Sequence, residues 1–294
     1  MDPVTHGILG AAVSQALFGK KLGKKAWLLG CLAAMVPDLD VLIRSGSDPL
    51  LYINYHRQFT HALIFAPLGG LIVGLLWLAL TKIHRPQWRW AILAAVCAYA
   101  THGMLDALTS YGTVLLWPFS NQRYVWDTIS IIDPVFMLVL LIGVIWSART
   151  LNPKPVRVAL LLSALYLAFG AWQHHRAILT QQYLLQENSQ TSYQSRVMPT
   201  LGNLFFWRSL YVVDDQIHFD MLSVLPMGKL KSPSFSSAMS LYQYHDLPLA
   251  IQKDARLTKD FELFHWFSDG LMTAFSYQPL IIVDARYLLP LEPL

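Results

Sequence analysis

Charged residues are scarce in this chain. Asp, Glu, Lys and Arg together make up 14% of its 294 residues, and 54% of the residues are hydrophobic. Soluble domains carry about 25% charged residues on average, so the deficit indicates an integral membrane protein rather than a soluble domain.

Cysteine and the common cofactor motifs are also rare or missing. The two cysteines, Cys31 and Cys97, both fall in apolar segments, so we expect no disulfide framework. The sequence contains no Walker loop, dinucleotide fingerprint, nucleophile elbow or zinc-finger spacing. Its net charge of +4 is modest and concentrated in loops, which indicates membrane topology and no nucleic-acid partner.

Long apolar stretches predict an α-helical polytopic membrane domain. They cover about 3–18, 26–43, 61–81, 90–109, 134–148 and 156–173. At about 1.5 Å per residue, a helix over 61–81 is about 31 Å long, which matches the hydrocarbon core of a bilayer. Because the first stretch is short, we expect five to six membrane helices.

The placement of basic residues predicts how these helices are oriented. Cytoplasmic loops of membrane proteins carry an excess of Lys and Arg. Alternate loops differ sharply: one set holds Lys20, Lys21, Lys24, Lys25, Lys82, Arg85, Arg89, Arg149, Lys154 and Arg157, and the other holds Arg44, Arg57 and Arg123. The first set is therefore expected to be cytoplasmic, which puts the N-terminus and everything after residue 174 on the extracytoplasmic side.

The pattern of the chain changes near residue 174. A polar helical pattern covers 174–188, and short alternating runs follow at 204–213, 217–225, 261–267 and 274–283. Asp214-Asp215-Gln216 is typical of a hairpin turn between two such runs. We therefore divide the chain into a membrane domain, 1–173, and a small, mainly β (α+β) extracytoplasmic domain, 174–294.

Histidines and aspartates are concentrated in the apolar segments. An ionisable group at the centre of a membrane helix costs about 2.5–3.5 kcal/mol, so such residues indicate function, and this pair of residue types commonly binds catalytic metals. In the predicted topology all of them lie toward the outer face. They are Asp2, His6, Asp38, Asp40, His56, His61, His102 and Asp106.

Local spacing indicates that several of these side chains converge. His102 and Asp106 are four residues apart and therefore share one helix face. Pro37 interrupts its helix, which allows both Asp38 and Asp40 to face one site. We predict a metal site with His6, Asp38, His56, His61, His102 and Asp106 as ligands and Asp40 as a further candidate.

These motifs also carry a family resemblance. Asp2-Pro3-Val4-Thr5-His6, Pro37-Asp38-Leu39-Asp40, His56-Arg57-x-x-Thr60-His61 and His102-x-x-x-Asp106 resemble the YdjM-type membrane-bound metal-dependent hydrolases. That family is remotely similar to zinc-dependent phospholipase C. The resemblance implies a bacterial inner-membrane protein. Because no second His-x-x-x-Glu is well placed, we expect one or two ions rather than three.

The ligand types predict the chemistry. Imidazoles mixed with carboxylates suit Zn²⁺, with Mn²⁺ or Fe as alternatives, and such a metal activates water for hydrolysis. A site at the outer face favours a phosphate- or ester-bearing lipid, or a lipid-linked molecule, as substrate. Arg57 is a candidate to hold a phosphate oxygen, and Asp40 or Asp133 a candidate general base. Two other interpretations stay open: an ion or metal transporter, and a non-catalytic membrane protein with a structural metal.

Overall fold

A computed structural model describes residues 1–81, 87–225 and 237–288. The predicted loop residues Lys82 and Arg85 lie outside these ranges. The chain forms two compact units. The helical unit comprises Met1–Ser47, Tyr55–Trp172 and Leu201–Asn203, and the C-terminal unit comprises Asp48–Asn54, Gln173–Thr200 and Leu204–Leu294.

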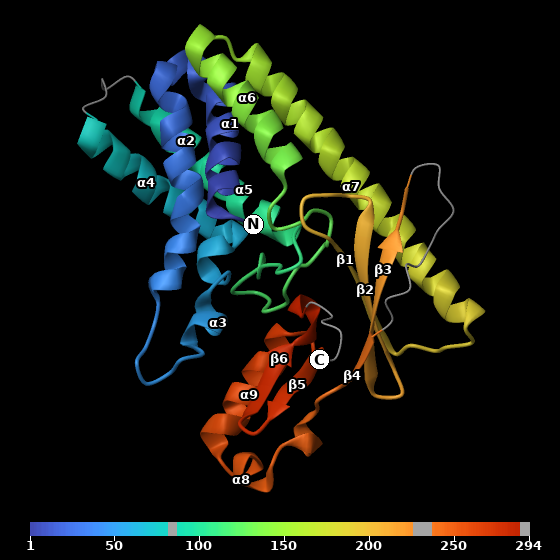
Figure 1. Ribbon diagram of the computed structural model, residues 1–294. Coiled ribbons are helices and arrows are strands. Elements are labelled where there is room, and N and C mark those ends of the chain that lie inside the picture. The colour runs from blue at the N-terminus through green and yellow to red at the C-terminus, as the bar shows by residue number, and fades with distance from the viewer. Residues whose placement is uncertain (82–86, 226–236, 289–294) are drawn as a thin grey trace. The chain divides into compact units, whose positions relative to one another are not determined.

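The helical unit is built from α-helices, with short 3-10 segments between α1 and α2 and between α2 and α4 (Figure 1). Asp2 begins the first helix by accepting a hydrogen bond from the Thr5 backbone N–H at 3.0 Å, and Pro3 follows at the first helical position. The helices are α1 (Pro3–Leu22), α2 (Ala26–Met35), α4 (Ala66–Thr81), α5 (Trp88–Ala107), α6 (Pro134–Thr150) and the first part of α7 (Lys154–Glu187). The 3-10 segments include η1 (Gly23–Lys25), η2 (Val36–Leu42), η3 (Phe59–His61) and η4 (Leu63–Phe65).

Two of the closest backbone approaches in this unit occur at glycines. A Cβ on Gly10 in α1 would lie 2.4 Å from the carbonyl oxygen of Gly30 in α2. A Cβ on Gly103 in α5 would lie 2.1 Å from the carbonyl oxygen of His61 in η3. Only glycine permits these approaches, which bring α1, α2, α5 and η3 close together.

Two helical stretches among the described residues are long and apolar enough to cross a membrane. They are Leu63–Thr81, which joins η4 to α4, and Lys154–Glu187, which is α7. Helix α6 is apolar but shorter. Five to six spans therefore remain a prediction. Helix α7 continues without a break past residue 173, so the helical patterns predicted over 156–173 and 174–188 belong to one element.

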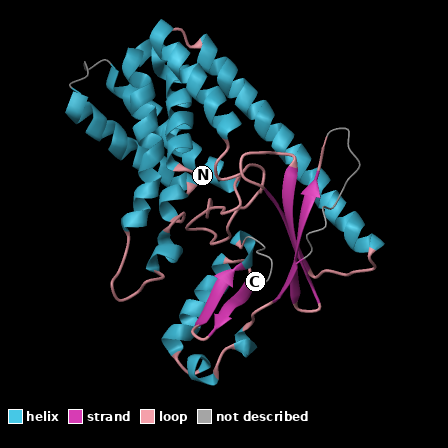
Figure 2. Ribbon diagram, viewed as in Figure 1, coloured by secondary structure: helices cyan, strands magenta, loops and turns pink. Residues whose placement is uncertain are grey.

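The C-terminal unit contains the named strands of the described chain (Figure 2). Its antiparallel four-stranded sheet has the order β1 (Gln194–Pro199), β2 (Phe206–Val213), β3 (Gln216–Ser223) and β4 (Ser237–Ser240). The predicted hairpin between 204–213 and 217–225 is confirmed, with Val213 paired to Gln216. Asp214 and Asp215 both adopt positive φ in its turn, a conformation that Asp tolerates better than most residues.

Of the two remaining runs predicted in this unit, the one at 261–267 is wrong and the one at 274–283 is β structure made of two strands. The run at 261–267 belongs to helix α9 (Ala255–Phe267), which Asp254 caps by accepting from the Arg256 and Leu257 backbone N–H groups. Leu257, Phe261 and Phe264 repeat at helical rather than strand spacing, which places their side chains on one helix face. The run at 274–283 is a hairpin of β5 (Met272–Tyr277) and β6 (Leu280–Asp284). This unit also contains the short helix α8 (Leu249–Gln252) and all but the last residue of the short helix α3 (Leu51–Tyr55).

Candidate metal centre

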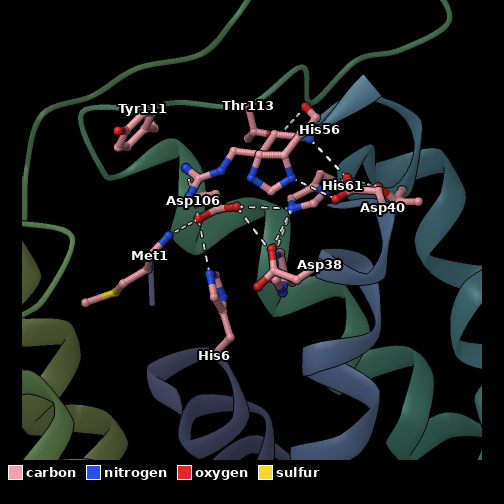
Figure 3. A network of polar contacts seen from close by, with 12 residues as sticks. Met1, His6, Asp38, Asp40, His56, His61, Asp106, Tyr111 and Thr113 are labelled. Carbon is pink, nitrogen blue, oxygen red and sulfur yellow. Dashed lines mark hydrogen bonds and ion pairs between the residues drawn. The ribbon is translucent and has the colours of Figure 1, made fainter. Parts of the chain in front are cut away.

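Ligand-type side chains from three separate segments meet in the helical unit. Segment η2 carries Asp38, η3 carries His61, and the last turns of α5 carry His102 and Asp106. One ligand atom from each of these four residues lies within 4.8 Å of the other three. Figure 3 shows Asp38, His61 and Asp106 pointing toward one another, with His6 and Met1 approaching Asp106 from the other side. Asp38, His61, His102 and Asp106 together form what we call the donor group.

The separations within the donor group match those of ligands around a single cation. The Nε2 atoms of His61 and His102 are 2.9 Å apart. Oδ1 of Asp38 lies 3.5 and 3.4 Å from these two nitrogens, and Oδ2 of Asp106 lies 3.3 and 3.4 Å from them. With metal–ligand bonds of about 2.0–2.2 Å, the corners of a tetrahedron are about 3.3–3.6 Å apart. The four carboxylate–imidazole separations of 3.3–3.5 Å therefore fit tetrahedral spacing, whereas the two imidazole nitrogens, at 2.9 Å, are closer together than tetrahedral corners.

Hydrogen bonds on the far side of each imidazole fix which nitrogen faces the donor group. Nδ1 of His102 donates to the Ala34 carbonyl oxygen at 2.6 Å, since a carbonyl can only accept. Nδ1 of His61 lies 3.2 Å from Oδ2 of Asp40. A carbonyl or carboxylate behind each ring is the usual way to orient a metal-binding histidine and leave the Nε2 lone pair available.

The electrostatics of the group favour a bound cation. Oδ2 of Asp106 is buried, has no hydrogen bond of good geometry among the described residues, and faces the two imidazole nitrogens at 3.3 and 3.4 Å. Burial alone would lower the pKa of His61, yet its contacts with Asp106, Asp38 and Asp40 raise that pKa to about 10. The carboxylates thus create a strongly negative potential at this point. The donor group could hold a divalent metal ion, which would satisfy the Asp106 oxygen and replace the proton on His61.

The other predicted ligands surround the donor group. His6 stacks on His102 with ring centroids 3.6 Å apart, and its Nε2 lies 3.1 Å from Oδ1 of Asp106. His56 contacts Oδ1 of Asp40 through Nδ1 at 2.7 Å. His6 therefore contacts two members of the donor group, and His56 contacts Asp40, but neither histidine belongs to the group itself.

Asp40 holds the segment that carries the histidines. Its Oδ2 accepts the Arg57 backbone N–H at 3.0 Å and the Thr60 hydroxyl at 2.8 Å, in addition to its contact with His61. With His56 at Oδ1, both carboxylate oxygens are engaged. Burial alone would raise the pKa of Asp40, but its contacts with His56 and His61 hold it below the usual range. This geometry favours a positioning role for Asp40 over that of a general base.

Arg57 provides a buried cation beside the donor group. Its side chain lies over the Tyr111 ring at 5.2 Å, and Nη1 lies 3.4 Å from Oδ1 of Asp106. Only 7% of the residue is exposed, yet Nε and Nη1 have no hydrogen-bond acceptor among the described residues. A guanidinium whose Nε has no acceptor among the described residues, and whose Nη1 makes a long ion pair with Asp106, is suited to bind an oxyanion such as phosphate.

Asp133, the other candidate general base, makes hydrogen bonds that stabilise the helices α6 and α7. Its Oδ1 accepts the Phe136 backbone N–H at 3.0 Å and so caps α6, while its Oδ2 accepts the Tyr166 hydroxyl at 2.8 Å. No hydrogen bond or ion pair found among the described residues joins it to the donor group. Its contacts therefore tie the start of α6 to α7.

Three participants were not predicted from the sequence. The Met1 amine contacts Oδ1 of Asp106, the Ala34 carbonyl orients His102, and Tyr111 lies against Arg57. A backbone carbonyl has no sequence signal, because every residue has one. Thr60, which directly precedes His61 in the sequence, also lies in the site, with its hydroxyl 3.0 Å from Nδ1 of His61.

A family model described as YdjM inner membrane protein matches residues 1–177, a stretch that includes the whole donor group. The chain belongs to this family. The resemblance inferred from the four motifs is thereby confirmed. The YdjM-family chain is also 31% identical over 137 residues to the inner membrane protein YbcI of Escherichia coli strain K12, a match covering 44% of this chain and 75% of that protein. No solved structure matches it.

Proposed function

We propose that this YdjM-family protein is a membrane-bound metal-dependent hydrolase acting on a phosphate- or ester-bearing lipid or lipid-linked substrate. The observation that carries the proposal is a buried guanidinium, that of Arg57, next to four convergent metal-type donors. Arg57 and Asp106 are 3.4 Å apart, so an anion on Arg57 would lie close to a cation in the donor group. We propose one or two divalent ions, with zinc as the first candidate and manganese or iron as alternatives.

The residues would divide the work as follows. Asp38, His61, His102 and Asp106 would hold the ion, which supplies Lewis acidity and a bound water of lowered pKa. Arg57 would bind and orient a phosphoryl or acyl oxygen, and its neighbour Tyr111 would keep the guanidinium in place. Asp38 has a 16% exposed side chain, so substrate would approach from its side of the group.

We further propose a multi-pass arrangement with the donor group at the extracytoplasmic face. Its support is the alternation of basic loops and the length of two apolar helices, Leu63–Thr81 and Lys154–Glu187. In this arrangement residues 174–294 lie on the same side as the donor group. A substrate in the outer leaflet would reach the donor group without crossing the membrane.

The test is metal content and hydrolysis measured on the same preparations. Full-length protein in mild detergent is analysed by inductively coupled plasma mass spectrometry and then assayed against phosphate- and ester-bearing lipids. Wild type should retain one or two ions per chain and hydrolyse at least one lipid class. His102→Ala should lose both properties, whereas the control His245→Ala, whose side chain is 75% exposed, should keep both. Full hydrolysis by His102→Ala would refute the proposal.

The donor group also supports a second candidate function, a structural metal site. Four protein ligands close a tetrahedron, whereas catalytic zinc sites use three and leave the fourth position for water. A closed site would brace η2, η3 and α5 without chemistry. In that case metal removal would lower the melting temperature strongly, and no lipid would be hydrolysed. A catalytic site instead requires zinc with a fifth ligand, or a six-coordinate ion such as manganese with two free positions.

A further inference from the structure

A large apolar groove lies in the helical unit between α6 and α7, away from the donor group's segments. Its volume is about 540 Å³, within the range of about 300–1,000 Å³ typical of ligand pockets. The helices approach closely at Gly143, where an added Cβ would lie 2.3 Å from the Ala159 Cβ. The groove is lined by Val139, Ile142, Gly143, Trp146, Thr150, Asn152, Lys154, Pro155, Val158, Ala159 and Leu162.

The lining changes from apolar to polar along the groove. Thr150, Asn152 and Lys154 lie at the connection between the two helices. The lining residues farther along α6 and α7, such as Ile142 and Leu162, are aliphatic. Trp146 lies one turn before Thr150, a position that suits a tryptophan at a membrane–water interface. The groove is therefore amphipathic along its length.

The dimensions and charge of the groove identify its occupant. From Val139 to Thr150 the α6 wall is about 16 Å long at roughly 1.5 Å per residue, close to half of a hydrocarbon core of about 30 Å. One acyl chain of a single leaflet has this reach. Lys154 is the charged residue of the described lining, and Arg149 is exposed one residue before Thr150. Both are cations, so the headgroup at this end should be anionic.

We propose that the α6–α7 groove binds one anionic phospholipid, with an acyl chain along the aliphatic walls and the phosphate beside Lys154. Lipid is the occupant that this location favours, because α7 is long and apolar enough to cross a membrane and would then be surrounded by lipid. The proposal is independent of hydrolysis at the donor group. A bound anionic lipid would then stabilise the packing of α6 against α7. The hydrogen bond from the Tyr166 hydroxyl to Asp133 also joins these two helices.

The test compares two lipids on delipidated full-length protein. The protein in detergent is titrated with dioleoylphosphatidylglycerol or dioleoylphosphatidylcholine, and bound lipid is counted by native mass spectrometry. A single basic residue near an anionic headgroup contributes a factor of roughly five in affinity. Wild type, with Lys154 and Arg149 at this end, should therefore bind one phosphatidylglycerol at least about fivefold more tightly than phosphatidylcholine. Lys154→Gln should weaken phosphatidylglycerol binding about fivefold and leave phosphatidylcholine binding unchanged.

A filling variant tests the location. Val158 lines the groove and is 55% exposed, while Leu161, on the same helix, is 60% exposed and does not line it. Val158→Trp should reduce binding of both lipids several-fold, and Leu161→Trp should bind like wild type. Equal affinity of wild type for the two lipids, or wild-type binding by Val158→Trp, would overturn the proposal. Equal losses in both tryptophan variants would overturn it too. If Val158→Trp does not fold, Lys154→Gln, which alters an exposed side chain, still decides the matter.

Discussion

Replacing Asp40 tests whether the donor group is a metal site organised by its supports. Asp40 lies behind His61 and accepts from four groups: His56 Nδ1, the Arg57 N–H, the Thr60 hydroxyl and His61 Nδ1. It does not belong to the four-atom donor group. A change in metal affinity on its substitution would therefore act through the orientation and charge of His61.

The size of the effect follows from what each substitution removes. In Asp40→Asn the amide oxygen can keep the Oδ2 contacts with Thr60 and His61, but the negative charge and one acceptor are lost. In Asp40→Ala all four contacts are lost and the η3 segment is released. Loss of such a partner behind a metal-binding histidine lowers metal affinity by about 10–100-fold, or about 1.4–2.7 kcal/mol. We expect about tenfold for Asp40→Asn and about a hundredfold for Asp40→Ala.

The assay is a zinc titration of metal-free full-length protein in detergent, in competition with a chelating dye. Asp133→Asn is the matched control, because Asp133 is equally buried but serves α6 and Tyr166 instead of His61. Its zinc affinity should equal that of wild type. Zinc affinity of Asp40→Asn and Asp40→Ala within twofold of wild type would refute the role assigned to Asp40.

Three further outcomes are expected. Gly103→Ala should lower metal content and destabilise the fold by about 1–3 kcal/mol in thermal melts, because its Cβ would push on the His61 carbonyl. The control Gly46→Ala, whose Cβ would meet no atom within 4 Å, should change neither property. Equal melting temperatures for the two variants would contradict this. Arg57→Gln should keep the metal but weaken binding of inorganic phosphate at least several-fold by isothermal calorimetry; unchanged phosphate binding would exclude Arg57 as the anion site. Zinc affinity should rise about tenfold per pH unit from pH 6 to 8, because the metal must displace a proton whose pKa on His61 is about 10; a flat profile would show that His61 is not a ligand.

Local signals allowed several features to be predicted from the sequence. Asp2 and Pro3 start α1, because capping depends on neighbouring residues only. His102 and Asp106 share a helix face because they are four residues apart on α5, and both enter the donor group. The hairpin turn at 214–216 could also be predicted, because the residues that favour the turn are those that form it.

Features that depend on packing could not be predicted. His6 and His61 both follow a threonine in an apolar context, yet His61 enters the donor group while His6 stacks on His102. The difference arises from the close approach of η3 to Gly103, which brings together residues about 40 positions apart in sequence. The strand predicted at 261–267 failed for a simpler reason: a short apolar run fits strand and helix equally well, and the cap at Asp254 decides for the helix.

Asp38 and Asp40 show how one short motif supplies two different functions. The break at Pro37 predicts that both carboxylates face one site. In the structure both contact the imidazole of His61, each at a different ring nitrogen. Oδ1 of Asp38 lies 3.5 Å from Nε2 of His61, and Oδ2 of Asp40 lies 3.2 Å from its Nδ1. The 3-10 segment η2 separates residues two apart by about 240° around its axis, given three residues per turn. One carboxylate therefore joins the donors while its neighbour orients the imidazole, a division of roles that follows from the backbone and that residue type alone does not reveal.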